Sequence, residues 1–134
     1  MALRYLIDTD VFSLMVKGQD PAVLAHMQTL ERGAATLSVI SAGEYFYGVA
    51  HAPVSKLRQQ RAERLMDFLG VMALDASVAN VYGTIRAALR AQGTPIGPND
   101  LWLAAQAQAQ RLTLVTRNVG EFRRVKGLKV NTWD

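Results

Sequence analysis

The chain has 134 residues, half of them apolar, and it contains no cysteine. This length and composition predict a single globular domain, residues 1–134, whose core is large enough to fold without disulfides. The absence of cysteine excludes thiolate-ligated zinc and iron–sulfur sites, and the two histidines, His26 and His51, have no metal-ligand spacing. Any bound metal would therefore take oxygen ligands, which favours Mg²⁺ or Mn²⁺.

The net charge is mildly positive, with 15 Lys and Arg against 11 Asp and Glu, a formal +4. This balance favours an anionic partner but does not identify one. The first apolar stretch is interrupted by Asp8, so it is too short for a signal peptide or a membrane span. We expect a cytoplasmic protein that does not associate with membranes.

Short apolar segments alternate with helical patterns along the chain. Strands are predicted at residues 3–7, 35–40, 71–74, 112–115 and 128–133. Helices are predicted at about 21–33, 54–69, 76–92 and 99–111, and a further one begins near residue 10. This alternation predicts an α/β architecture with a largely parallel sheet, whose carboxyl strand ends share one edge, where such sheets bind ligands.

Acidic and polar residues follow the ends of the predicted strands: Asp8, Ser41, Glu44, Asp75, Asp100 and Glu121. Each has a structural explanation when considered alone. Ser41-x-x-Glu44 matches a capping box, Asn99 or Asp100 suits the cap of the helix that begins there, and Asp75 suits a cap for a helix starting near Ser77. Glu121 alone is compatible with an ordinary surface acid.

The same acids taken together indicate a shared site. Carboxylates gathered at one edge repel one another, and such a group needs protons or a cation to be stable. A hard divalent ion supplies that cation. With basic helices nearby, magnesium-assisted phosphodiester chemistry is the favoured class of function.

Four blocks in order, "YLIDTDVF", "SVISAGEYFYGV", "IGPNDLWLAAQAQAQ" and "LTLVTRNVGEFRRVKGLKVNTW", give the chain a close resemblance to PIN-domain ribonucleases. Among these it resembles the VapC-type toxins of bacterial toxin–antitoxin pairs, nearly end to end. The resemblance implies a PIN-like three-layer sandwich with a central, mostly parallel five-stranded sheet flanked by helices. It also implies an Mg²⁺- or Mn²⁺-dependent endoribonuclease that forms a homodimer and is inhibited by a cognate antitoxin.

The resemblance also assigns roles to particular residues. It implies catalytic roles for Asp8, Glu44, Asp100 and Glu121, the first three as metal ligands. Glu121 stands where the family usually has aspartate, which leaves its direct metal contact open. Thr116, Asn118 and Asp10 are expected to line the pocket. Asp10 replaces the family's usual asparagine and is assigned as the cap of the helix through Val11, Phe12 and Leu14.

Two other surfaces have alternative interpretations. Basic side chains on two predicted helices are candidates for RNA phosphate contacts or for a merely solvated face: Arg58, Arg61, Arg64, Arg86 and Arg90. The aromatic run Tyr45, Phe46 and Tyr47 is a candidate for a partner interface or for the core.

The D-x-D at residues 8 and 10 leaves two other functions open. An apolar strand followed by D-x-D also resembles haloacid dehalogenase-type phosphatases, in which the first aspartate is a nucleophile. A non-enzymatic receiver domain would use Asp75 as a phosphoacceptor. Neither alternative finds its remaining motifs, a suitably placed lysine and an acidic pair, in this chain.

Overall fold

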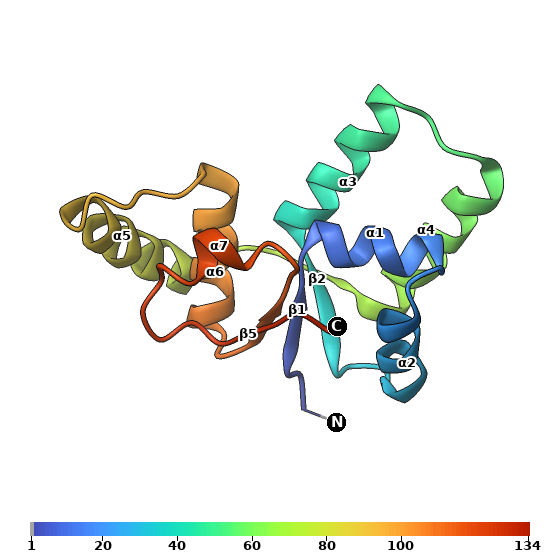
Figure 1. The fold of residues 1–134 in the computed structure, drawn as a ribbon, viewed down its shortest axis with the longest axis horizontal. Helices are drawn as coiled ribbons and strands as arrows, with labels where there is room; N and C mark the ends of the chain where they lie inside the picture. Colours follow the sequence, from blue (N-terminus) through green and yellow to red (C-terminus); the bar gives the residue numbers. More distant parts are fainter. Residues whose placement is uncertain (1) are drawn as a thin grey trace.

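The computed structural model describes residues 2–134, so the first residue of the predicted domain lies outside it. Over these residues five strands and seven helices alternate along the chain (Figure 1). The strands are β1 Tyr5–Ile7, β2 Ala35–Ser38, β3 Val71–Met72, β4 Thr113–Val115 and β5 Val130–Asn131. The helices are α1 Thr9–Lys17, α2 Pro21–Thr29, α3 Val39–His51, α4 Lys56–Leu69, α5 Ala76–Ala91, α6 Pro98–Ala109 and α7 Val119–Phe122.

All five predicted strands are present, each shorter than predicted, and they form one sheet in the order β3-β2-β1-β4-β5. Every pairing is parallel. In this register Ile7 lies opposite Leu37 on one side and Val115 on the other. The chain therefore leaves β1, β2 and β4 at the same edge of the sheet, and the residues that follow these strands become neighbours.

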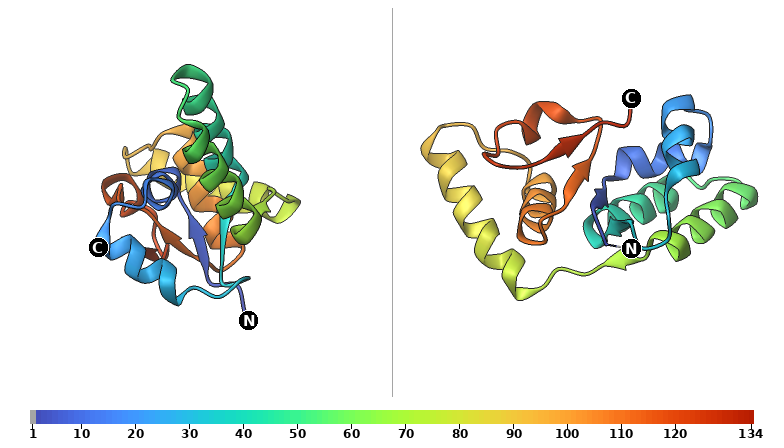
Figure 2. Two further views of the ribbon diagram at one scale, coloured as in Figure 1. Left: turned by 90° about the vertical axis from the view of Figure 1, so that its right-hand side faces the viewer. Right: turned by 90° about the horizontal axis from the view of Figure 1, so that it is seen from below.

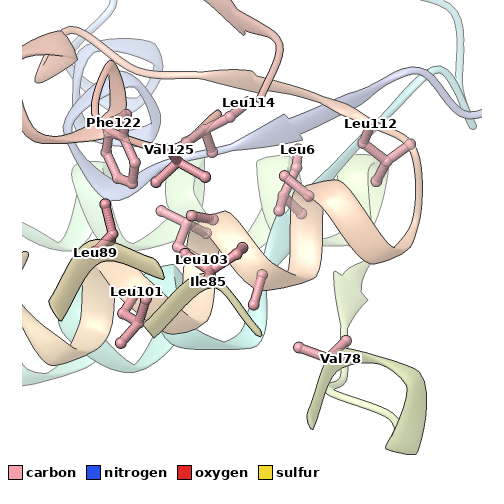
Figure 3. Packing of buried hydrophobic residues seen from close by; sticks show 13 residues of the cluster. Leu6, Val78, Ile85, Leu89, Leu101, Leu103, Leu112, Leu114, Phe122 and Val125 are labelled. Carbon is pink, nitrogen blue, oxygen red and sulfur yellow. The ribbon is translucent and has the colours of Figure 1, made fainter. Parts of the chain in front are cut away.

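Both faces of the sheet are covered, and side-chain alternation decides which residue faces which layer. Leu6 and Leu114 belong to the core under α5 and α6, shown in Figure 3. Ile7, Leu37 and Val115 belong to a second core with residues of α1 to α4. In Figure 1, α5, α6 and α7 lie to the left of the sheet and α1 to α4 to the right, and the right-hand view of Figure 2 shows the same separation from below. The structure is thus the expected α/β three-layer sandwich.

The predicted caps of α3 and α6 are wrong. Helix α3 begins at Val39 and is capped by Ser38, whose Oγ accepts a hydrogen bond from the Ile40 amide at 3.1 Å. Ser41 and Glu44 consequently lie inside the helix and form no capping box. Helix α6 begins at Pro98 with Gly97 at the cap position, because proline suits the first helical turn, so neither Asn99 nor Asp100 caps it.

The first helix also begins earlier than predicted. Its cap residue is Asp8, which accepts from the Thr9 amide, and Asp10 lies in the first turn. The assignment of Asp10 as the cap is therefore wrong. Asp75 does cap α5, as predicted, and accepts from the amides of Ser77 and Val78.

The aromatic run on α3 is divided between the core and the surface. Tyr45 is half-buried and packs edge-on against Phe12, with ring centroids 5.0 Å apart. Phe46 and Tyr47 are 58% and 70% exposed, so the core interpretation is wrong for these two side chains. Among residues 2–134, no helix combines the length and the apolar character that a membrane span requires.

Candidate active site

Four acidic residues from four separate segments approach one another at the carboxyl edge of the sheet, and we call them the acid cluster: Asp8, Glu44, Asp100 and Glu121. Asp8 follows β1 directly. Glu44 lies in the second turn of α3, Asp100 in the first turn of α6, and Glu121 in α7. Parallel strands deliver these segments to one edge, as the sequence predicts.

Asp8 is buried at the centre of the site, with only 6% of its surface exposed. Its Oδ2 accepts a hydrogen bond from Thr116 Oγ at 2.8 Å, and its Oδ1 accepts from the Thr9 amide at 2.7 Å and from Ser41 Oγ at 3.4 Å. Burial, followed by repulsion from Asp10, raises the pKa of Asp8 to about 6. The charged form of Asp8 is thus disfavoured despite three donors, because it lies in a low-dielectric site beside other acids.

Helix α3 joins the site through the side chains of Glu44 and Ser41. Thr9 Oγ donates to Glu44 Oε1 at 2.8 Å, which connects α1 to α3. Ser41 lies one turn before Glu44, on the same helix face, and its buried hydroxyl points to Asp8. Neither Thr9 nor Ser41 was predicted as a site residue. The sequence did hold a signal for each. Thr9 lies between Asp8 and Asp10, and Ser41 lies three residues before Glu44, so both are close in sequence to predicted site residues.

Asp100 and Glu121 form a hydrogen-bonded carboxyl pair. Burial, the hydrogen bond to Glu121 and the charge of Asp8 raise the pKa of Asp100 to about 7. The bond that Asp100 donates lowers the pKa of Glu121, to which the Gly97 amide also donates at 3.5 Å. Glu121 therefore interacts directly with Asp100 and is not an isolated surface acid.

The loop after β4 closes the site from the other side. The Arg117 amide donates to Asp10 Oδ2 at 2.8 Å, while Asp10 Oδ1 accepts from the Val11 amide at 2.7 Å. The Asn118 amide donates to Thr116 Oγ at 3.1 Å, so the predicted pocket residue Asn118 acts here through its backbone. Asp10 thus holds the Thr116 loop beside Asp8.

The side chain of Arg117 connects this loop to the C-terminal segment and to Asp20, the cap residue of α2. Its guanidinium donates to the carbonyls of Thr132 and Trp133 at 2.6 and 2.8 Å and forms an ion pair with Asp20 at 3.3 Å. Trp133 is buried with φ +52°, an uncommon conformation for a tryptophan, and the bond to its carbonyl helps to hold it. Nothing in the sequence pattern indicated this role of Arg117.

The chemistry of the acid cluster fits a hard divalent cation. All the candidate ligands are oxygen atoms, and burial, together with repulsion from neighbouring carboxylates, raises the pKa values of Asp8 and Asp100. Within residues 2–134 no three acidic side chains are already arranged to hold one ion, so joint ligation requires side-chain rotation. The site is a set of suitable donors around a common centre rather than a finished coordination shell.

Comparison with known proteins agrees with this geometry. The family model described as PIN domain matches residues 5–128. This chain belongs to the PIN-domain family. It is similar to the tRNA(fMet)-specific endonuclease VapC of Shigella flexneri, 31% identical over 131 residues that cover 98% of each chain. It is also similar to ribonuclease VapC2 of Rickettsia felis, 28% identical over 131 residues, or 97% of this chain and 98% of that protein.

Solved structures place the PIN domain among VapC-type proteins. The crystal structure of VapBC2 from Rickettsia felis, bound to a promoter DNA fragment, matches with a TM-score of 0.88 at 27% identity over 98% of this chain and 100% of that chain. DNA-bound VapBC from Salmonella typhimurium matches with a TM-score of 0.88 at 28% identity over 98% and 99% of the two chains. The predicted fold class and the VapC-type resemblance are confirmed.

The two alternatives to a PIN domain lose their support. Asp75, the acceptor that a receiver domain would need, caps α5 and accepts bonds from Ser77 Oγ and Gln110 Nε2. A phosphatase would use Asp8 as a nucleophile, whereas a family match over residues 5–128 assigns this strand end to a PIN domain.

The predicted RNA-binding arginines of the PIN domain do not form a single surface. Arg58, Arg61 and Arg64 belong to α4, and Arg86 and Arg90 belong to α5. Figure 1 shows these helices on opposite sides of the sheet. The two groups are separate candidates.

Proposed function

We propose that this PIN domain is an Mg²⁺-dependent endoribonuclease, with Mn²⁺ as an alternative ion, and that it acts in the cytoplasm as the toxin of a toxin–antitoxin pair. One observation carries the proposal. Four acids from distant segments meet at the carboxyl edge of a PIN-domain sheet, where burial and mutual repulsion raise the pKa values of Asp8 and Asp100 to about 6 and about 7. A bound cation would stabilise such a site by neutralising its charge, and it could activate a water molecule there.

In this proposal Asp8, Glu44 and Asp100 hold the ion, and Glu121 acts beside Asp100. A bound divalent ion would neutralise the cluster, polarise a phosphate oxygen and lower the pKa of a water. The Thr116 hydroxyl keeps Asp8 oriented by its 2.8 Å hydrogen bond. The carboxylates of the acid cluster would fix the position of the attacking water and help to take up its proton.

We expect cleavage by in-line attack of water, leaving a 5′-phosphate and a 3′-hydroxyl. The positions of the histidines support metal-assisted hydrolysis over a histidine mechanism. His26 stacks on Trp133, with ring centroids 4.9 Å apart, and His51 stacks on Tyr47. Neither ring lies among the contacts of the acid cluster within residues 2–134.

Two protein partners belong to the proposal: a cognate antitoxin and a second copy of the chain. The similar VapBC structures support the antitoxin. The exposed Phe46 and Tyr47 lie just after Glu44 on α3, so an apolar partner surface adjoins the acid cluster. We assign this aromatic surface to protein partners rather than to the core.

The test is RNA cleavage by the purified chain with Mg²⁺, with EDTA, and with the variant Asp8→Asn. Wild-type protein should cut RNA only with the divalent ion, and Asp8→Asn should be inactive while keeping its circular dichroism spectrum. Asp67→Asn is the matched control, because Asp67 is exposed and lies on α4. Cleavage that persists in EDTA, or in Asp8→Asn, would refute the assignment.

A cellular experiment tests the toxin role. Inducible expression of wild-type chain in a bacterium should arrest growth and generate new RNA 5′ ends, which sequencing identifies. Asp8→Asn should produce neither effect, and co-expression of the cognate antitoxin should prevent both.

A further inference from the structure

The structure contains a hollow of about 500 Å³ between α5 and α6, which we call the α5–α6 hollow. Its lining includes Tyr82, Arg86, Leu89, Arg90, Ile96 and Leu101. We propose that this hollow is a subsite for an unpaired nucleotide that flanks the bond to be cut. The inference rests on the proposed ribonuclease function, whose substrate it extends beyond the acid cluster.

The hollow and the acid cluster share a wall. Residues 92–97 connect α5 to α6. On one side of this connection the Gly97 amide faces Glu121, and on the other side Ile96 lines the hollow. Asp100 and Leu101 are consecutive in the first turns of α6, one in the acid cluster and one in the hollow. An RNA strand with a phosphate at the acids therefore has the hollow within reach of its neighbouring nucleotide.

The rim of the hollow carries uncompensated positive charge. Arg86 and Arg90 are four residues apart, so they project from the same side of α5. Helix α5 contains no acidic residue over Ala76–Ala91, and within residues 2–134 the ion pairs formed are Arg32–Asp67 and Arg117–Asp20 only. Two guanidinium groups without acidic partners favour a phosphate backbone.

One of these arginines is held in place by an aromatic stack. Tyr82 and Trp102 stack with ring centroids 3.8 Å apart and an interplanar angle of 17°, which joins α5 to α6. Arg86 Nη1 donates to Tyr82 Oη at 3.1 Å, and Arg86 Cζ lies 6.0 Å from the Tyr82 ring centroid. A guanidinium that is oriented before binding loses less entropy when it meets an anion.

The floor of the hollow is apolar, as a nucleobase requires. Leu89 and Leu101 belong to the core beneath it (Figure 3), and Ile96 packs against that core. A charged rim above an apolar floor matches the two parts of a nucleotide, the phosphate and the base. Helix α4 differs, since Glu63 and Asp67 accompany its arginines.

The experiment measures binding of a fluorescein-labelled single-stranded RNA by anisotropy in EDTA, so that metal-dependent cleavage does not interfere. The double variant R86E/R90E should lower the affinity by about tenfold or more. It should also reduce the slope of log affinity against log salt by roughly 1 to 1.5, since each phosphate contact contributes about 0.7. Y82F, which removes the hydroxyl that orients Arg86, should cause a smaller loss.

The matched control is R111E/K129E, an equal charge reversal at two exposed residues that precede β4 and β5, at the sheet edge opposite the acid cluster, which should change affinity by less than about twofold. Equal losses in R111E/K129E and R86E/R90E, or no loss in either, would overturn the subsite. A change in the mass of R86E/R90E in light scattering would instead assign the hollow to a second copy of the chain, and so reject it. If wild-type protein binds RNA through this surface but never cuts it, the hollow stands as an RNA-binding site and the nuclease proposal fails.

Discussion

Two polar residues of helix α6, Gln106 and Asp100, lie in contrasting environments. Gln106 is completely buried, yet it donates to the carbonyls of Met72 and Ala73 at 3.0 and 3.3 Å and accepts from Ser38 Oγ. Asp100, less than two turns earlier, meets other acids, and its pKa rises to about 7. The neutral side chain of Gln106 has hydrogen-bond partners for its polar atoms and stabilises the fold. The carboxyl group of Asp100 needs a proton or a cation to offset the repulsion of its neighbours. This need indicates that the end of α6 that carries Asp100 is the functional one.

Replacing the acid should have the largest effect, on catalysis. Asp100→Asn removes a proposed metal ligand but keeps a donor to Glu121, so the fold should persist while cleavage falls by about a hundredfold or more. Initial rates on a labelled RNA with Mg²⁺ measure this loss. Asp67→Asn should retain the wild-type rate, and an active Asp100→Asn protein would remove Asp100 from the site.

Replacing the neutral residue should instead affect stability. Gln106→Leu leaves two carbonyls and the Ser38 hydroxyl without their partner, so the free energy of unfolding should fall by roughly 2–4 kcal/mol. Urea unfolding measures the change, with the exposed Gln60→Leu as control. A variant as stable as wild type would show that the Gln106 contacts contribute little.

The pH dependence of stability should separate the two environments further. The raised pKa of Asp8, from 3.8 to about 6, means that the folded state binds more protons than the unfolded state in this range. In EDTA the stability contributed by protonated Asp8 is complete below about pH 4 and is lost as the pH rises through about 6, by up to roughly 3 kcal/mol. Thermal melts at about pH 5 and pH 7.5 should show the protein less stable at the higher value.

Mg²⁺ should restore stability at the higher pH, because the ion replaces the protons. In EDTA, Asp100→Asn should melt higher than wild type near neutral pH, since one repelling carboxylate is gone. Asp20 and Asp75 have lowered pKa values, caused chiefly by hydrogen bonds from Val23 and Ser77, so their contributions are lost only in more acidic solution. A melting temperature that rises with pH in EDTA would contradict the crowding of charge at the cluster.

The smallest expected effect concerns the support of the site. Arg117→Ala removes the bonds to Thr132 and Trp133 and the ion pair with Asp20. We expect a loss of about 1–2 kcal/mol, because the pair is partly solvated. Thermal melts should show it, together with a change in Trp133 fluorescence in a Trp102→Phe background. Arg123→Ala, at an exposed position, should change neither signal.

Local patterns predicted the strands, most helices and the edge at which the acids meet, because strand and helix periodicity is written in consecutive residues. Cap positions were less predictable. Ser41, Asn99, Asp100 and Asp10 all suit caps by residue type, and the path of the chain decides which residue is used. The bonds of Thr9 to Glu44, Arg117 to Thr132 and Ser38 to Gln106 join residues 35, 15 and 68 positions apart, and no local signal reports them.

The sheet ends on both sides in strands of two residues, β3 Val71–Met72 and β5 Val130–Asn131. Such short edge strands expose few unpaired amides and carbonyls, so a strand from another molecule can form few backbone hydrogen bonds with them. Stacking of molecules edge to edge into fibres is correspondingly disfavoured. Recognition of this protein should proceed through the side chains of its helices and loops, and a peptide that relied on backbone pairing with the sheet would find almost no template.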